Sequence, residues 1–285
     1  MIASLLNHGN GDRALRAGDS GGRRLWSGCA SLWAPCASGR FPLGSSYSTR
    51  DQAISDLGFL RQGLRKSGGG TVGANPFGYG LALSGAGGGF LVASGSLGNF
   101  NFIHQSAVYS FAALVRSDAV STNSVIVYSC LGSSVNTGFQ VRQNSSGIID
   151  ALVARSGGFV VFGSSASALV AGAWTMIVVA SDGAFQRIWL NGRRSGADTA
   201  IGTLGGSDAS YAMGIGCYGG GVNTNVWNGQ LAWFGIWKRA LGGSDARALT
   251  ADPLCMFRRR RQSLGRGPGF RPWFVHRSTL LGGIA

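Results

Sequence analysis

The sequence predicts an all-β protein, an antiparallel sandwich of two sheets, and three observations lead to that prediction. Glycine makes up 49 of the 285 residues, glutamate is absent, and lysine occurs only at Lys66 and Lys238. Frequent glycines between short runs of Val, Ile, Phe and Trp are typical of tight turns that join short strands. Glutamate and lysine favour helices, so a chain that nearly lacks both is poorly suited to a helical fold.

The beginning of the chain contains a predicted arm, a first strand and one helical stretch. Residues 1–25 lack apolar periodicity and are expected to form a flexible basic arm. A first strand is expected within residues 25–36, where two tryptophans supply bulk. Residues 48–66 have helical character, because apolar residues recur there at every third or fourth position. These residues are Ile54, Leu57, Leu60 and Leu64.

Short strands are predicted throughout residues 71–237. Their ranges are 80–83, 90–93, 108–116, 124–130, 138–143, 148–155, 158–162, 174–181, 185–190, 212–217 and 230–237. Two pairs of strands are expected to be hairpins, one closed by Ser156-Gly157 and one by Asp182-Gly183-Ala184. Asp-Gly is a strong signal for a hairpin turn. Evenly spaced short strands are typical of sandwiches and jelly rolls.

Two motifs in the last strands point to a known family. Trp174 opens a strand, Asp182-Gly183 turns the chain, and Leu190-Asn191-Gly192 closes the pair. Residues 227–241 then read Trp-Asn-Gly-Gln-Leu-Ala-Trp-Phe-Gly-Ile-Trp-Lys-Arg-Ala-Leu. This pattern resembles the laminin-G-like domains of the concanavalin A-like lectin/glucanase superfamily. The resemblance implies a concanavalin A-like jelly roll over residues 26–257, followed by a basic C-terminal tail at residues 258–285.

The exit from this predicted domain suggests where the protein works. It reads Asp252-Pro253-Leu254-Cys255-Met256-Phe257-Arg258, which is similar to the exits of phage and prophage virion proteins with the same fold. The similarity implies a tail, fibre or head-surface protein of the virion that adheres to host glycans or docks to other virion proteins. A cellular lectin-like carbohydrate-binding module is the first alternative, and a protein that contacts nucleic acid through its tail is the second. The sequence leaves open whether the protein forms a homo-oligomer.

The composition argues against an enzyme. Most glycosidases use two carboxyl groups at a set separation. The glucanases of the superfamily that this chain resembles carry glutamates on a strand. This chain has no glutamate. The three histidines, His8, His104 and His276, stand far apart in the sequence. We therefore expect a non-enzymatic binding protein without catalytic residues or a cofactor.

The best candidate for a carbohydrate site is the loop region at residues 211–228. It gathers aromatic and amide side chains around Gly219-Gly220-Gly221: Tyr211, Tyr218, Asn223, Asn225, Trp227 and Asn228. Aromatic faces pack on the CH groups of sugars, and planar amides bind sugar hydroxyls. The alternative is a structural loop in which Trp227 packs at the edge of the sandwich, since buried rings are the common case.

Calcium is a further ligand that the resemblance implies. Laminin-G-like domains hold it at a rim of the sandwich through carboxylates and backbone carbonyls. The candidates by residue type are Asp118, Asp150, Asp182 and Asp208, and no site is assigned among them. Asp182 has a simpler interpretation as the aspartate of a tight turn.

The end of the chain is strongly basic. Arg258, Arg259, Arg260 and Arg261 open a tail that holds seven arginines and no acid. Arginines neutralise phosphates and interleaved aromatic rings stack on bases, so nucleic acid is one possible partner. An acidic neighbour in the virion is another, and a solvated run of charge is the third interpretation. The sequence shows no secretory signal and no apolar run long enough to span a membrane, so we expect a soluble or assembled protein.

Overall fold

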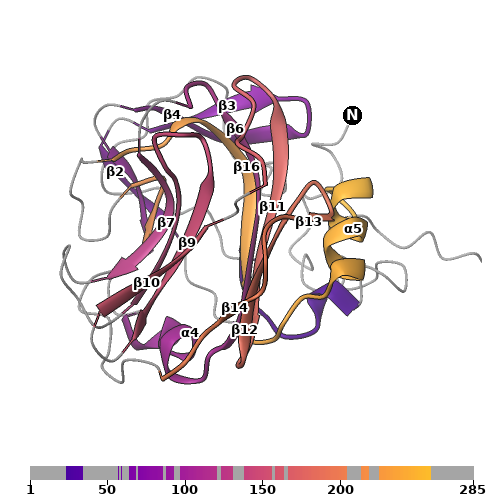
Figure 1. The fold of residues 1–285 in the computed structure, drawn as a ribbon. Helices are drawn as coiled ribbons and strands as arrows, with labels where there is room; N and C mark the ends of the chain where they lie inside the picture. Colours follow the sequence, from indigo (N-terminus) through magenta and orange to yellow (C-terminus); the bar gives the residue numbers. More distant parts are fainter. Residues whose placement is uncertain are drawn as a thin grey trace, which may run out of the picture.

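The computed structural model describes residues 24–34, 57, 59, 64–68, 70–85, 88–92, 97–120, 123–130, 138–155, 158–163, 166–203, 213–217 and 225–257. These residues form two antiparallel sheets that pack face to face (Figure 1). The prediction of an all-β sandwich of two sheets is therefore confirmed. Residues 1–23 of the predicted arm and the predicted tail at 258–285 lie outside the described residues.

The first sheet contains the longest strands. Its order is β13-β12-β11-β6-β16-β4-β3, with β1 beside β16 and β14 beside β12. The strands are β1 (Cys29–Trp33), β3 (Thr71–Asn75), β4 (Gly78–Ser84), β6 (Val108–Ser117), β11 (Trp174–Asp182), β12 (Phe185–Leu190), β13 (Arg193–Arg194), β14 (Thr199–Ala200) and β16 (Asn228–Trp237). Both β4 and β1 pair with β16, β4 along its first half and β1 along its second.

The second sheet has the order β10-β9-β8-β7-β15-β5-β2. Its strands are β2 (Leu64–Gly68), β5 (Gly88–Val92), β7 (Ser124–Cys130), β8 (Gly138–Gln143), β9 (Ile149–Arg155), β10 (Gly158–Gly163) and β15 (Gly214–Ile215). Short helical elements in the described part of the chain include η2 (Leu97–Phe100), α4 (Phe102–Gln105) and α5 (Gly243–Ala251). None of the helices in the described part of the chain is long and apolar enough to cross a membrane.

Both predicted hairpins are present. β11 and β12 pair with Ser181 opposite Gln186, so the Asp-Gly segment turns the chain as predicted. β9 and β10 pair with Arg155 opposite Gly158. The predicted strand pattern therefore gives the correct local pairings in each of these two places.

The core between the sheets follows from the alternation of side chains along each strand. In β6, Tyr109, Phe111 and Val115 are buried among residues of both sheets. Trp33 of β1 stacks on Phe234 of β16, with ring centroids 4.6 Å apart. These buried residues form the core between the two sheets.

The central strands of the first sheet are also apolar on their other face, and α5 lies against that face (Figure 1). We call this second group of buried residues the outer cluster. Its larger members are Leu25, Leu32, Leu114, Met176, Val178, Trp189, Trp233, Trp237, Leu241, Leu249 and Met256. Trp237 Nε1 donates to the carbonyl of Leu25 at 2.6 Å. Leu25, the last residue of the predicted arm, therefore packs with the sandwich.

The predicted helix at 48–66 is wrong at its C-terminal end. Leu64 opens β2, is fully buried in the core and pairs with Val92 of β5. Leu57 lies outside any helix, and its N–H donates to the carbonyl of Leu32 at 2.8 Å. Pairing with neighbouring strands outweighs the helical spacing here, and residues 48–56 lie outside the described part of the chain.

Candidate functional site

The predicted carbohydrate site is described only in part. Tyr211, Tyr218 and Asn223 lie outside the described residues, whereas Asn225, Trp227 and Asn228 lead into β16 at one end of the sandwich. Asn225 is exposed and adopts a positive φ of 52°, and its carbonyl accepts a hydrogen bond from Val125 N at 2.8 Å. Asn225 therefore shapes the entry into the strand.

Trp227 is a core residue. Its side chain is fully buried in the cluster between the sheets. Its Nε1 donates to the carbonyl of Arg116 at 3.3 Å, and its backbone N–H donates to Gly216 at 2.9 Å. A ring in this position has no face open to a sugar, so Trp227 is corrected from a binding residue to a packing residue.

Asn228, in contrast, is half-buried on the outer face of the first sheet, beside a row of other half-buried side chains. Five half-buried residues on five adjacent strands form one cross-strand row on this face: Trp174, Arg116, Gln230, Ala82 and Thr71. The pairings of β11 with β6, β6 with β16, β16 with β4, and β4 with β3 place them opposite one another. The strand neighbours Val115, Leu231, Leu81 and Val72 belong to the core cluster, and Trp174 packs against the outer cluster, which places the five residues on the outer face.

A polar border runs beside the cross-strand row at the end of the sandwich. Asn228 pairs with Ser84, and its carbonyl accepts a hydrogen bond from Asp118 N at 2.9 Å. Arg116 and Asp118 form an ion pair at 2.8 Å, with about a third of each side chain or more exposed. The row and its border thus present a guanidinium, a carboxylate and two amides with nearly balanced charge.

An aromatic pair bounds the row on its other side. Phe77, in the turn between β3 and β4, packs edge to face on Trp174, with ring centroids 5.3 Å apart. Two strands separate β4 from β11 in the sheet, so the β3–β4 hairpin must bend back over the outer face to make this contact. Gly73 lies close to Gln230, since a Cβ added to it would lie 4.0 Å from Gln230 Nε2.

One side-chain atom of Gln230 lacks a hydrogen bond in this arrangement. Among the described residues, its Oε1 is buried without a hydrogen-bond donor. A buried polar atom without a partner calls for an explanation, such as a water or a ligand. The sequence reasoning missed Gln230, Arg116 and Trp174 as site residues, although strict alternation along their strands would have placed all three on one face.

Comparison with known proteins identifies the family. The family model described as the concanavalin A-like lectin/glucanases superfamily, a laminin-G-like model, matches residues 85–246, more than half of the chain. The chain belongs to this superfamily. No curated protein sequence matches it.

Solved structures of the superfamily fold resemble the chain over most of its length. Domain 4 of AbnA, a GH43 extracellular arabinanase from Geobacillus stearothermophilus in complex with arabinotriose, has 15% identity and a TM-score of 0.57, and the match covers 78% of this chain and 98% of that one. The receptor-binding domain of botulinum neurotoxin C/D mosaic serotype has 14% identity and a TM-score of 0.55, covering 79% and 51%. A Trypanosoma rangeli sialidase mutant with trans-sialidase activity has 14% identity and a TM-score of 0.56, covering 81% and 34%. At these identities the likeness concerns the fold alone.

The calcium candidates that lie in the described part of the chain are engaged by arginines. Asp118 pairs with Arg116, and Asp150 lies 3.5 Å from Arg142. Asp208 lies outside the described residues. Within the described ranges, no three side chains of metal-binding type lie close enough together to hold an ion.

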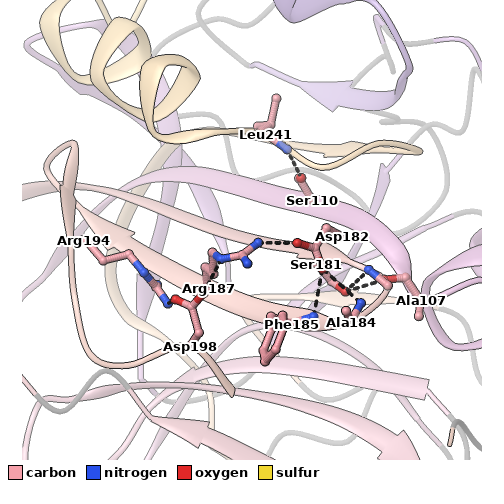
Figure 2. A network of polar contacts seen from close by, with 11 residues as sticks. Ala107, Ser110, Ser181, Asp182, Ala184, Phe185, Arg187, Arg194, Asp198 and Leu241 are labelled. Atoms are coloured by element: carbon pink, nitrogen blue, oxygen red, sulfur yellow. Dashed lines mark hydrogen bonds and ion pairs between the residues drawn. The ribbon is translucent and has the colours of Figure 1, made fainter. Parts of the chain in front are cut away.

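Asp182 belongs to a chain of alternating charges that ties the β11–β12 hairpin to its neighbours (Figure 2). Its Oδ1 accepts the N–H groups of Phe185 at 2.8 Å and Ala184 at 2.9 Å, and Oδ2 pairs with Arg187. The bond from Phe185 and that from Arg187 lower the pKa of Asp182 to about 2. The interpretation of Asp182 as a turn residue is confirmed.

The charge chain continues to a second aspartate. Arg187 Nε bonds Asp198 at 2.7 Å, and Arg194 bonds the other oxygen of Asp198. These bonds, led by that from Arg194, lower the pKa of Asp198. The network therefore has a structural role, because each carboxylate is occupied by a guanidinium.

Proposed function

We propose that the protein is a non-enzymatic carbohydrate-binding domain and that the cross-strand row contacts the sugar. The observation that carries this proposal is the alignment of Trp174, Arg116 and Gln230, from three adjacent strands, on one partly exposed face. An aromatic ring provides a face for sugar CH groups, while amide and guanidinium groups bind hydroxyls. Sites on strands hold such groups more rigidly than sites on loops.

The same row is poorly equipped for hydrolysis. Glycoside hydrolysis requires two carboxyl groups in defined positions, one of them protonated. The row and its border contain one carboxylate, Asp118, and Arg116 holds it in an ion pair at 2.8 Å. The Arg116 guanidinium occupies this carboxylate, and the row offers no second carboxyl group within the described residues. This supports binding as the function.

Two of the fold neighbours support this proposal. One of them was solved in complex with arabinotriose, and another is a receptor-binding domain. Neutral arabino-oligosaccharides are therefore sensible first probes for the chain.

The test is a glycan array with the full chain at physiological salt, with and without calcium, followed by titration of the best neutral ligand. We expect Gln230→Ala and Asn228→Ala each to weaken binding about tenfold, roughly 1.4 kcal/mol. Arg193→Gln is the matched control, since Arg193 is exposed on β13 outside the row. A blank array would exclude the glycan proposal, and binding that survives both row variants would move the site elsewhere.

A virion location is the second candidate, favoured by the exit sequence at residues 252–258. In the structure this exit is docked: Met256 is buried, and its carbonyl accepts a hydrogen bond from Trp26 Nε1 at 2.9 Å. Mass spectrometry of purified virions from a producing host would detect the chain if the proposal is correct, and its absence from the particle would exclude it. Arg258 to Arg261 lie outside the described residues, so nucleic-acid contact through the tail stays a prediction.

A further inference from the structure

The turn between β3 and β4 carries an amide that is bonded at one end only. Asn75, the last residue of β3, accepts the N–H of Phe77 through its Oδ1 at 2.8 Å. This bond fixes the orientation of the side chain. Among the described residues, its other end, Nδ2, is buried without a hydrogen-bond acceptor. Asn75 is thus held in place by the turn and retains a donor with no partner.

This donor lies over a pair of glycines that also borders Gln230. Gly73 and Gly80 are opposite each other in β3 and β4. A Cβ added to Gly80 would lie 2.5 Å from Asn75 Nδ2, so the amide occupies the place of a side chain there. A Cβ added to Gly73 would lie 4.0 Å from Gln230 Nε2. Because the Cβ positions of opposed residues are about 5 Å apart, the two amides lie near each other on the outer face.

The two amides lack complementary partners. Within the described ranges, Nδ2 of Asn75 is a donor without an acceptor, and Oε1 of Gln230 is an acceptor without a donor. A buried polar atom without a partner is costly, and here two of opposite kind come from neighbouring elements. A hydroxyl group both donates and accepts hydrogen bonds, so a single hydroxyl is able to bond both amides.

We propose that Asn75 and Gln230 together bind one hydroxyl group of a neutral sugar, which donates to Gln230 Oε1 and accepts from Asn75 Nδ2. This inference rests on the proposed function of the row. It adds Asn75, which lies outside the row, as a residue that determines specificity. A carboxylate has no hydrogen to donate to Gln230, and an ammonium group cannot accept from Asn75. The pair therefore selects a hydroxyl over a charged group.

The sugar reaches the two amides only when the turn moves outward, because both atoms are shielded from solvent in the structure. The edge-to-face packing of Phe77 on Trp174 holds the turn against the sheet. The unpaired amides favour opening, since water or a sugar hydroxyl then bonds them. We therefore expect Phe77→Ala, which removes the ring contact, to speed the association of the sugar. Association that becomes no faster would contradict this route of entry.

The decisive variant is Asn75→Asp in the full chain. It keeps an oxygen that accepts the N–H of Phe77 and replaces the donor with a second acceptor, so the turn is retained while the hydroxyl loses one bond. The probe is the neutral oligosaccharide that binds best on the array, beginning with the arabino-oligosaccharides. We expect its affinity, measured by calorimetry, to fall at least about tenfold. Asn191→Asp is the matched control, because Oδ1 of Asn191 also accepts a backbone N–H, that of Met176 at 2.9 Å, but the residue is exposed and outside the row.

Monodeoxy analogues of the same sugar identify the hydroxyl. One analogue should bind the unmodified protein at least about tenfold more weakly, yet bind Asn75→Asp as weakly as the parent sugar does, because both changes remove the same bond. In the unmodified protein, the side-chain amide signals of Asn75 in NMR should shift and saturate with the parent sugar, a readout that needs no variant.

The outcomes separate this inference from the proposed function. A blank array excludes both together. Binding that is lost in Gln230→Ala and kept in Asn75→Asp overturns this inference alone, as do independent losses in every deoxy analogue or amide signals of Asn75 that the sugar does not move.

Discussion

Arg239 connects residues near the start of the domain with residues near its end, and replacing it should lower the free energy of unfolding substantially. Its guanidinium donates to the carbonyls of Arg24 and Ser27, both at 2.7 Å, and to Asp245 at 3.2 Å. Arg239→Met keeps the aliphatic part, which packs near Gly28, and removes these bonds. Each bond to a carbonyl contributes about 0.5–1 kcal/mol, and leaving the buried Asp245 with a single guanidinium costs about 1–2 kcal/mol. The free energy of unfolding should therefore fall by about 3 kcal/mol.

Urea unfolding followed by tryptophan fluorescence measures this change, and the melting temperature should fall by about 6–12 °C for a domain of this size. Arg116→Met is the control, because it also removes an arginine from an ion pair, but its partner Asp118 is 42% exposed. Exposed pairs contribute less than about 1 kcal/mol. Equal losses in the two variants would refute the argument that burial and the backbone contacts give Arg239 its weight.

Three further predictions concern the core, the hairpin and the edge of the row. Trp227→Ala should lower the free energy of unfolding by about 3–5 kcal/mol, because the ring is fully buried; a small loss in urea unfolding would contradict that burial. The folded pKa of Asp182 is about 2, below its unfolded value, so its contribution is present above about pH 4 and disappears as the pH falls towards 2. Acid unfolding of Asp182→Asn should lack this component, and identical profiles would count against it. Gly229→Ala should both destabilise the domain and weaken glycan binding, because the φ of Gly229 is 144° and an added Cβ would lie 2.0 Å from the carbonyl oxygen of Arg116. Normal stability and binding of the variant would show that Gly229 does not lie so close to Arg116.

The strands and hairpins were predictable because their signals are local. Alternation along β6 and the Asp-Gly turn at residues 182–183 depend on residues next to each other in the sequence, and the structure pairs them as expected. α5 was missed because its first residue follows a glycine N-cap and it buries few apolar side chains, among them Ala246 and Leu249. Its stability comes from packing on the outer cluster, a tertiary effect that the sequence of the helix does not contain.

The binding surface was harder to predict for the same reason. Trp227 stands among asparagines and glycines, as a binding residue would, yet its indole N–H bonds the carbonyl of Arg116, 111 positions earlier. The cross-strand row joins Thr71 and Gln230, at opposite ends of the domain sequence, through Ala82. Only the order of strands and their register bring such residues together, and a single sequence does not reveal them.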